Sequence, residues 1–567
     1  MHDRVLRGGL VIDGTGAPGR EADVAIDGGR IAAVGEVRGR GREEVDCRGL
    51  LVCPGFVDMH THYDGQATWD PWLTPSGWHG VTTAVVGNCG VGFAPCREED
   101  REWLIGVMEG VEDIPGTALH EGIRWSWRSF PEYLDALERS PLALDVGAFV
   151  PHASVRGYVM GRRASEQAQA DEAEIDAMRQ IVAEALRAGA LGFSTSRTSL
   201  HRTAEGVLVA GTDAAVPELE GICEALAEVG HGVFEIADEH GHVPADLDWL
   251  AGIARRTGRP VVFNLSQIDA APELWREGLA GVERAAAAGI PLFAQAAGRA
   301  IGVHQSWRAT AHPFALCNTW AGISHLGWDE QLRHLRDPAF RERMIADEPF
   351  FIGEFQQFIT RTFDRMFPVE AGFEPDPAES VGARARRLGL SPAAVAYDAL
   401  TADDGAGMLY FPLFNYARGD LDLLHALHSH PRVLMGLSDG GAHCGAICDG
   451  GMPTFMLTHW ARDRTRGPRL PLEHVIHRQT QATAAFVGLR DRGVLAPGMR
   501  ADVNVIDFDR LGFGRVHMAW DLPAGGRRLV QRATGYRLTL VAGVPTRVDD
   551  EATGATPGRL VRGPQAA

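Results

Sequence analysis

The sequence predicts a (β/α)8 barrel of the TIM type, joined to a small β-sandwich domain that is built from both termini. Through the middle of the chain, eight apolar segments typical of buried strands are separated by amphipathic helical patterns. Short alternating segments between glycine-rich turns occupy residues 1–50 and recur near the other end of the chain. A doubly wound open sheet is the competing architecture.

The two ends of the chain have the same character and are therefore assigned to one β domain. Its first part is residues 1–50, with strands expected at 5–12, 22–26 and 30–34. Its second part is residues 488–567, with strands expected within 498–507 and 538–545. The tail from Asp549 is rich in glycine, proline and arginine, so we expect it to be loose.

Residues 51–487 are assigned to the barrel. Apolar stripes at helical spacing run through 175–186 and 219–226, between expected strands. The active site of such a barrel lies at the carboxyl ends of its strands. The eight strands are expected at 51–58, 82–87, 145–150, 190–194, 232–237, 260–265, 290–295 and 433–437.

The last two of these strands are separated by a segment that is too long to be a loop. Residues 297–432 must therefore carry structure of their own. The segment is rich in aromatic residues, including Trp307, Trp320 and Phe355. It is expected either to cover the mouth of the barrel as a lid or pocket wall, or to form a packing subdomain or oligomer contact without a substrate role.

Composition excludes several kinds of chemistry. The formal net charge of −19 argues against nucleic acid and anionic membrane as partners. All 55 basic residues are arginines, because the sequence contains no lysine. This excludes a Schiff-base lysine, a phosphate-loop lysine and a carboxylated lysine that bridges two metals.

The compartment is expected to be the cytoplasm. The sequence begins with an alternating strand pattern and not with the apolar run of a signal peptide. No run of about 18 apolar residues is present, so no membrane span is expected. The 8 cysteines are scattered through a long chain, which favours free thiols in a reducing compartment.

The strongest local signal is a pair of histidines after the first expected barrel strand. His60 and His62 are two residues apart, so their imidazoles lie on the same face if the strand pleat continues through them. Two neutral imidazoles at the carboxyl end of a buried strand are suited to binding a divalent metal. Two hydrogen-bonded core histidines are the alternative interpretation.

Five short motifs are spread through nearly the whole chain. They are residues 54–62 (Pro-Gly-Phe-Val-Asp-Met-His-Thr-His), 87–90 (Gly-Asn-Cys-Gly), 189–196 (Gly-Ala-Leu-Gly-Phe-Ser-Thr-Ser), 437–440 (Leu-Ser-Asp-Gly) and 498–503 (Gly-Met-Arg-Ala-Asp-Val). Together they resemble the amidohydrolase superfamily, and within it the D-aminoacylase branch, the N-acyl-D-amino-acid deacylases.

The resemblance implies a metal-dependent hydrolase and assigns roles to particular residues. His60 and His62 would be metal ligands, and Cys89 would take the bridging place that lysine fills elsewhere in the superfamily. Asp439 would be both metal ligand and general base. Zinc is the expected metal, as one or two ions, although other divalent metals would also suit the site.

The sequence departs from the family pattern after the fifth and sixth strands. Glu235 stands where the family has a histidine ligand, and it is expected to supply a carboxylate ligand instead. Leu265 stands at the second family histidine and Gln267 at a family lysine, which makes Gln267 a candidate for substrate binding. His240, His242 and His443 follow strands five and eight and are further imidazoles that could restore coordination.

The expected partner is a small-molecule amide substrate. A substrate carboxylate would need an arginine, for which a bidentate guanidinium is suited. The candidates for substrate binding are Arg197, Arg202 and His201, in the loop after the fourth strand. Alternative functions are cyclic-amide hydrolysis, as in hydantoinase-like or dihydropyrimidinase-like enzymes, and a non-catalytic barrel that serves as a binding or scaffold protein. The sequence leaves the oligomeric state open.

Overall fold

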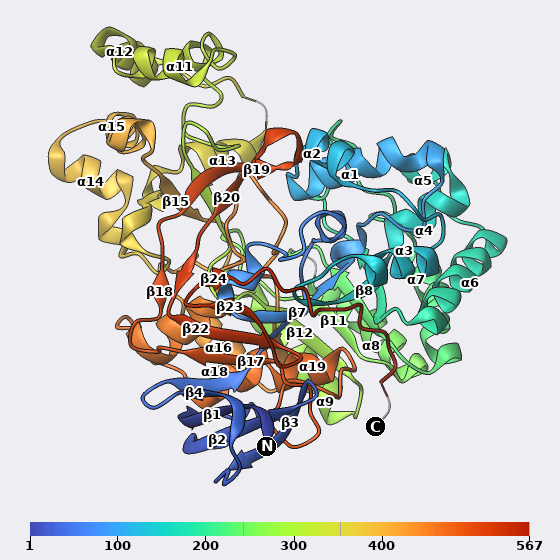
Figure 1. Ribbon diagram of the computed structural model, residues 1–567. Coiled ribbons are helices and arrows are strands. Elements are labelled where there is room, and N and C mark those ends of the chain that lie inside the picture. The colour runs from blue at the N-terminus through green and yellow to red at the C-terminus, as the bar shows by residue number, and fades with distance from the viewer. Residues whose placement is uncertain (242, 352, 566–567) are drawn as a thin grey trace.

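The centre of the molecule is a parallel sheet of eight strands that closes on itself (Figure 1). The computed structural model describes residues 1–241, 243–351 and 353–565. The sheet runs from β6 to β16, and it closes where Thr61, after β6, pairs in parallel with Gly440, after β16. The predicted (β/α)8 barrel is thereby confirmed. Its strands are β6 (Phe56–Asp58), β7 (Val81–Val86), β8 (Asp145–Pro151), β9 (Gly192–Ser196), β10 (Val233–Ala237), β11 (Val261–Asn264), β12 (Leu292–Ala296) and β16 (Val433–Met435).

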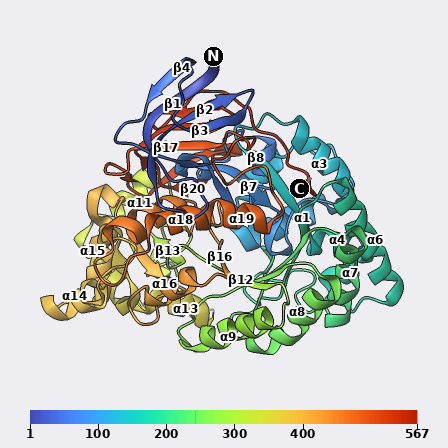
Figure 2. The ribbon, with the colours of Figure 1, turned by 90° about the horizontal axis from the view of Figure 1, so that it is seen from below.

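Helices cover the outside of this sheet, as the view in Figure 2 shows. The predicted stripe at 175–186 lies in α6, which begins with a capping box between Asp171 and Glu174 and ends at Gly189, whose φ is 114°. Among the described residues, no helix is both long and apolar enough to cross a membrane. The helices are α1 (Arg101–Glu112), α2 (Gly116–Gly122), α3 (Phe130–Arg139), α4 (His152–Met160), α5 (Arg162–Ser165), α6 (Glu172–Ala188), α7 (Val216–Val229), α8 (Val243–Thr257), α9 (Leu274–Ala287), α16 (Asp422–Ser429), α17 (Met452–Phe455), α18 (Leu472–Gln479) and α19 (Gln481–Phe486).

The two ends of the chain share a second sheet of nine strands, seen at the bottom of Figure 1. The expected strand at 51–58 is divided between the two sheets at Gly55. A Cβ at Gly55 would lie 2.2 Å from Thr82 Oγ1, so glycine permits the close crossing. The nine strands are β1 (His2–Val11), β2 (Arg20–Asp27), β3 (Arg30–Gly35), β4 (Gly41–Asp46), β5 (Leu51–Pro54), β17 (Val503–Ile506), β22 (Tyr536–Val541), β23 (Val544–Val548) and β24 (Glu551–Ala552).

The C-terminal tail is docked and not loose, which corrects the expectation for residues after Asp549. Gly558 pairs with Leu142 and Leu560 pairs with Val146, so the tail adds to the amino end of β8. Leu560 and Val561 are buried. Composition misled here, because two apolar side chains within a polar tail are enough to anchor it against the barrel.

The segment 297–432 has its own hydrophobic core and a three-stranded sheet, as expected for an insertion of this length. Within that core Trp307 stacks on Trp320 and contacts the Tyr397 ring edge-on. Two further ribbons follow the barrel, β18 (Gly512–Phe513) with β21 (Ala533–Thr534), and β19 (His517–Leu522) with β20 (Gly526–Val530). The insertion contains β13 (Gly302–Gln305), β14 (Phe367–Pro368), β15 (Leu409–Pro412), α10 (Asn318–Ala321), α11 (Trp328–Leu335), α12 (Pro338–Ala346), α13 (Glu354–Arg361), α14 (Val381–Leu388) and α15 (Pro392–Gly405).

A buried charge cluster joins the barrel to the second half of the terminal domain. Asp145, at the start of β8, is fully buried. It accepts hydrogen bonds from Arg492 Nη1 at 2.6 Å, from Arg500 Nη2 at 2.9 Å and from the backbone N–H of Arg559 at 2.9 Å. One carboxylate therefore holds the linker, the terminal sheet and the tail against the barrel.

Removing that carboxylate charge tests its structural role. We predict that Asp145→Asn lowers the free energy of unfolding by about 1.5–3 kcal/mol, because Arg492 and Arg500 lose their shared charged acceptor while Asp502 remains beside both. Urea unfolding followed by circular dichroism measures the change. The matched control is Asp135→Asn, which removes a 54% exposed partner of Arg562 and should change stability by less than about 1 kcal/mol. Equal effects of the two substitutions would contradict the prediction.

Candidate metal centre

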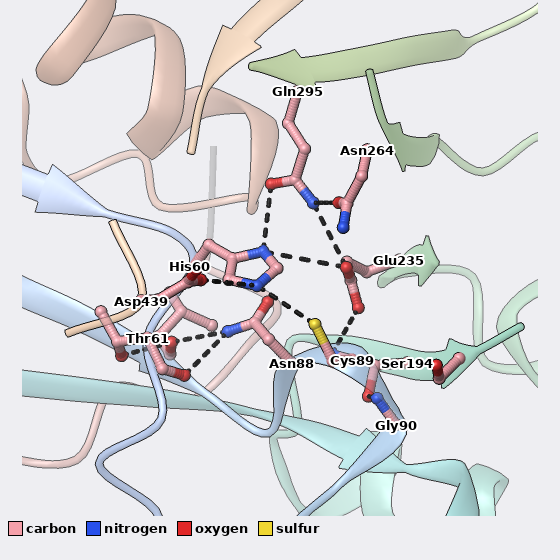
Figure 3. A network of polar contacts seen from close by, with 12 residues as sticks. His60, Thr61, Asn88, Cys89, Gly90, Ser194, Glu235, Asn264, Gln295 and Asp439 are labelled. Atoms are coloured by element: carbon pink, nitrogen blue, oxygen red, sulfur yellow. Dashed lines mark hydrogen bonds and ion pairs between the residues drawn. The ribbon is translucent and has the colours of Figure 1, made fainter. Parts of the chain in front are cut away.

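Three metal-ligating side chains meet at the carboxyl end of the barrel. His60 and His62 follow β6, and Cys89 follows β7 in the next strand of the sheet. All three are buried, and one ligand atom from each lies within 4.8 Å of the others. The sequence prediction that the two imidazoles lie on one face is therefore met by the geometry. Figure 3 shows the Cys89 thiol beside the His60 ring.

Asp439 brings a carboxylate to the same point from the opposite side of the closure. Its Oδ1 lies 3.4 Å from His60 Nε2 and 3.8 Å from His62 Nε2, and His60 Nε2 lies 3.3 Å from Cys89 Sγ. Ligand atoms of a tetrahedral site with bonds of about 2.0–2.3 Å lie about 3.3–3.8 Å apart. His60, His62 and Cys89 thus have the chemistry and the spacing of a site for one divalent ion, and the Asp439 carboxylate lies beside the two imidazoles.

The ring of His60 is held by a network from three neighbouring strands (Figure 3). His60 Nδ1 lies 3.2 Å from Gln295 Oε1, and Gln295 Nε2 donates to Glu235 and to Asn264. Donation from Nδ1 to the amide oxygen leaves the lone pair on Nε2, which faces the metal centre. Burial lowers the pKa of His60 to about 3, so the ring is neutral, as a ligand must be.

His62 faces a second carboxylate. Its Nδ1 lies 3.2 Å from Glu112 Oε1, and Glu112 Oε2 lies 3.7 Å from His443 Nε2. Glu112 is 1% exposed, and neither of its carboxylate oxygens has a well-directed hydrogen bond. Burial, together with the nearby Asp439 and Asp64, raises the pKa of Glu112 well above its ordinary value. A carboxylate behind a ligating imidazole orients the ring and increases its basicity.

The backbone around the centre is strained. Cys89, Leu437, Asp439 and His443 all have left-handed conformations, with φ between 47° and 56°. Each such residue costs about 1–3 kcal/mol unless it is glycine, and strain of this kind is concentrated at functional sites. All four residues line one cavity. The fold therefore maintains an unfavourable backbone at the positions that present these side chains.

That cavity has a volume of about 310 Å³. At the barrel end, the cavity is lined by the candidate metal ligands, by Glu112 at the end of α1, by Asp238 after β10 and by Asn264 of β11. We call this part of the lining the floor. Much of the cavity wall comes from the insertion. The apolar lining residues are Val111, Leu200, Ala237, Ile301, Val303, Ala311, Phe355, Ile359, Leu413, Phe414, Leu437, Ala446 and Ile447.

Comparison with known proteins identifies the family. A family model described as "Amidohydrolase family" matches residues 43–547. The chain belongs to the amidohydrolase family. The resemblance drawn from the sequence motifs is thereby confirmed.

Curated relatives place this amidohydrolase near enzymes that act on N-acyl-D-amino acids. It is 28% identical to D-aminoacylase from Alcaligenes xylosoxydans xylosoxydans, over 99% of this chain and 97% of that protein. It is 30% identical to N-acyl-D-glutamate deacylase from the same organism, over 92% of this chain and 90% of that protein.

Solved structures agree with these relatives. One is a D-aminoacylase with a binuclear metal center. It matches with a TM-score of 0.65 at 27% identity, covering 99% of this chain and 100% of that one. N-acyl-D-glutamate deacylase from Bordetella bronchiseptica, complexed with zinc and a phosphonate inhibitor, matches with a TM-score of 0.65 at 26% identity, with the same coverage of both chains.

Several residues that the sequence suggested for this amidohydrolase lie outside the cavity. The Arg197 guanidinium donates to Ala214 O and lies over the Trp249 ring. Arg202 donates to backbone carbonyls of its own loop. Gln267 bonds to the loop of Asn415 and borders a different cavity. Loop geometry directs these long side chains away from the metal centre, which sequence position alone did not reveal.

His201 and Glu235 do lie near the metal centre. His201 lines the cavity, and its Nδ1 pairs with Ser196 Oγ at 2.8 Å. Glu235 lies behind Cys89 and accepts a hydrogen bond from the Cys89 backbone N–H at 2.9 Å. Burial raises the pKa of Glu235 to about 8. The Glu235 side chain accepts hydrogen bonds from the Cys89 N–H and from Gln295 Nε2, and it thereby holds both residues in place.

The residue of β11 that reaches the network is Asn264 and not Leu265. Leu265 packs in the hydrophobic core beside Gly278, since neighbouring side chains of a strand face opposite sides. His240 and His443 both line the cavity, whereas His242 lies outside the described residues.

Glu112 was missed at the sequence level, although a signal was present. In α1 the buried positions are Leu104, Ile105, Val107, Met108, Val111 and Glu112. A glutamate at a position where helical periodicity predicts an apolar residue indicates a buried carboxylate with a specific partner.

We predict that Glu112→Gln weakens the binding of zinc by about 10–100-fold, because the His62 ring loses its carboxylate partner. Competition of the purified protein with a chromophoric chelator measures the affinity. The matched control is Glu102→Gln on the same helix, where the side chain is 77% exposed. The prediction fails if the two variants bind zinc equally well.

Proposed function

We propose that this amidohydrolase hydrolyses the C–N bond of a small N-acyl amide in a metal-dependent reaction, as N-acyl-D-amino-acid deacylases do. The observation that carries the proposal is the convergence of His60, His62, Cys89 and Asp439 on one point at the carboxyl end of the barrel. Retention of all four groups, on strained backbone, favours catalysis over a scaffold role. The named relatives support the same reaction class.

Zinc is the proposed ion, held by His60, His62 and Cys89, which leaves a coordination position for water beside Asp439. A thiolate with two imidazoles suits zinc better than it suits magnesium or calcium. Burial and the neighbouring acids raise the pKa of the Cys89 thiol well above its ordinary value, so binding of the ion must displace the thiol proton. The bound ion would polarise the amide carbonyl and lower the pKa of water to about 7.

Asp439 is the proposed general base. Burial, with Asp449 and Asp58 nearby, raises the pKa of Asp439 to about 8 in the metal-free chain. Its carboxylate takes a proton from the attacking water and passes it to the departing amine nitrogen. The backbone of residues 437–443 fixes its direction, and the lined cavity around it limits the entry of other water.

The experiment that tests this function is a hydrolysis assay of the zinc-loaded protein. The panel contains N-acetyl D- and L-amino acids, N-acetyl amines and cyclic amides, and release of free amine is measured. We predict turnover of at least one linear N-acyl amide, its loss on chelation and its return with added zinc, since the reaction needs the ion.

Asp439→Asn is the control for the chemical step. At saturating zinc it should lower kcat by about 10²–10⁴-fold with an unchanged circular dichroism spectrum, because an amide cannot accept the proton. Turnover of cyclic amides alone would replace the proposal with the cyclic-amide alternative. No turnover on any substrate, with zinc binding below one equivalent, would leave the scaffold role.

A further inference from the structure

The described lining of the cavity offers no guanidinium or ammonium group to a substrate carboxylate. Among the residues that the structure describes, its lining includes neither arginine nor lysine. The sequence contains no lysine at all, and the undescribed positions 242, 352, 566 and 567 are histidine, isoleucine and alanine. A guanidinium or ammonium group for a carboxylate is therefore not supplied by these side chains.

Three arginines on elements that border the cavity have partners elsewhere. Arg299, which follows β12, is fully buried and donates to Asp449 and to Cys448 O. Arg365, in the insertion, pairs with Asp269 and also contacts the carbonyl of Pro412. Arg197 is directed at Ala214, as described above.

Carboxylates line the cavity instead. Glu112, Asp238 and Asp439 all border it. Asp238 is fully buried, and its Oδ2 has no hydrogen-bond partner, like both oxygens of Glu112. A substrate carboxylate would lose its hydration in this cavity without a guanidinium or ammonium group to replace it. The positive charge of a bound ion is offset by the Cys89 thiolate and by the Asp439 carboxylate beside it.

The part of the cavity wall that comes from the insertion suits an apolar group. Ile301, Val303, Ile359, Leu413 and Phe414 line the cavity from the insertion, and all except Phe414 are at least 91% buried. The insertion is held there by β13, whose Val303 pairs with Ile447 of the loop after β16. The wall is therefore part of the packed fold, and it offers apolar surface to a bound molecule.

We infer that the substrate of this site is an uncharged N-acyl amine without a carboxylate, whose apolar part lies against the wall formed by the insertion. The inference rests on the proposed function and narrows its substrate class. It also separates this chain from the N-acyl-D-glutamate deacylase named above, whose substrate carries carboxylates.

A matched pair of ligands tests the inference by binding, independently of turnover. N-acetylphenethylamine and N-acetyl-D-phenylalanine differ only in the carboxylate of the latter. We predict that the zinc-loaded protein binds the neutral amide at least about tenfold more tightly in titration calorimetry, because the acid must bury its charge without a guanidinium or ammonium partner. Tighter or equal binding of the acid, or no measurable binding of the neutral amide, would overturn the inference.

A substitution in the cavity wall tests the physical cause. Leu200 lines the cavity and is 40% exposed, so a longer side chain can be placed there without filling the core. Leu200→Arg should increase binding of N-acetyl-D-phenylalanine by about tenfold, because it supplies the missing cation. Leu200→Met is the matched control and should leave the preference unchanged. A gain that is equal in both variants would contradict the electrostatic explanation.

The two proposals fail separately. If the neutral amide binds more tightly but neither compound is hydrolysed, the inference on substrate class stands and the proposed function fails for this pair. If both are hydrolysed but the acid binds more tightly, the proposed function stands and the inference on substrate class is wrong.

Discussion

The closure of the barrel between β6 and β16 is the contact on which the site depends. Thr61 pairs with Gly440, and the His62 N–H donates to the Gly440 carbonyl at 2.8 Å. The Ser438 hydroxyl contacts both Asp58 and the His60 carbonyl at the same place. These bonds bring residues almost 380 positions apart into register, so that Asp439 faces both imidazoles. Without this closure, the carboxylate and the histidines would belong to opposite edges of an open sheet.

The cavity at this closure has two chemically different sides, one lined by the barrel and one by the insertion. Its floor carries the ligands and the acceptors of the barrel, and its wall is apolar because the insertion before β16 folds over the mouth. Glu235 and Asn264 hold Gln295 by hydrogen bonds, and Gln295 thereby holds the ring of His60. The polar network thus supports one ligand of the metal centre, while the wall restricts what can approach it.

The architecture and the four central residues could be predicted from the sequence, because each depends on local pattern. Strand periodicity placed His60 and His62 on one face, and the motif around Cys89 and Asp439 carried the resemblance. The supporting groups could not be predicted. Glu112 comes from a helix, and Asn264 acts through its contact with Gln295, which depends on tertiary structure. Arg197 shows the opposite error, because the direction of a long loop side chain depends on its tertiary partners.

The central claim is that one thiolate and two imidazoles share a metal ion in this chain. X-ray absorption at the zinc edge of the protein carrying one equivalent of zinc measures this directly. We predict one sulfur neighbour at about 2.3 Å with nitrogen and oxygen neighbours at about 2.0–2.2 Å, and loss of the sulfur signal in Cys89→Ser. A spectrum without sulfur, or one that keeps its sulfur in Cys89→Ser, would contradict the proposed centre.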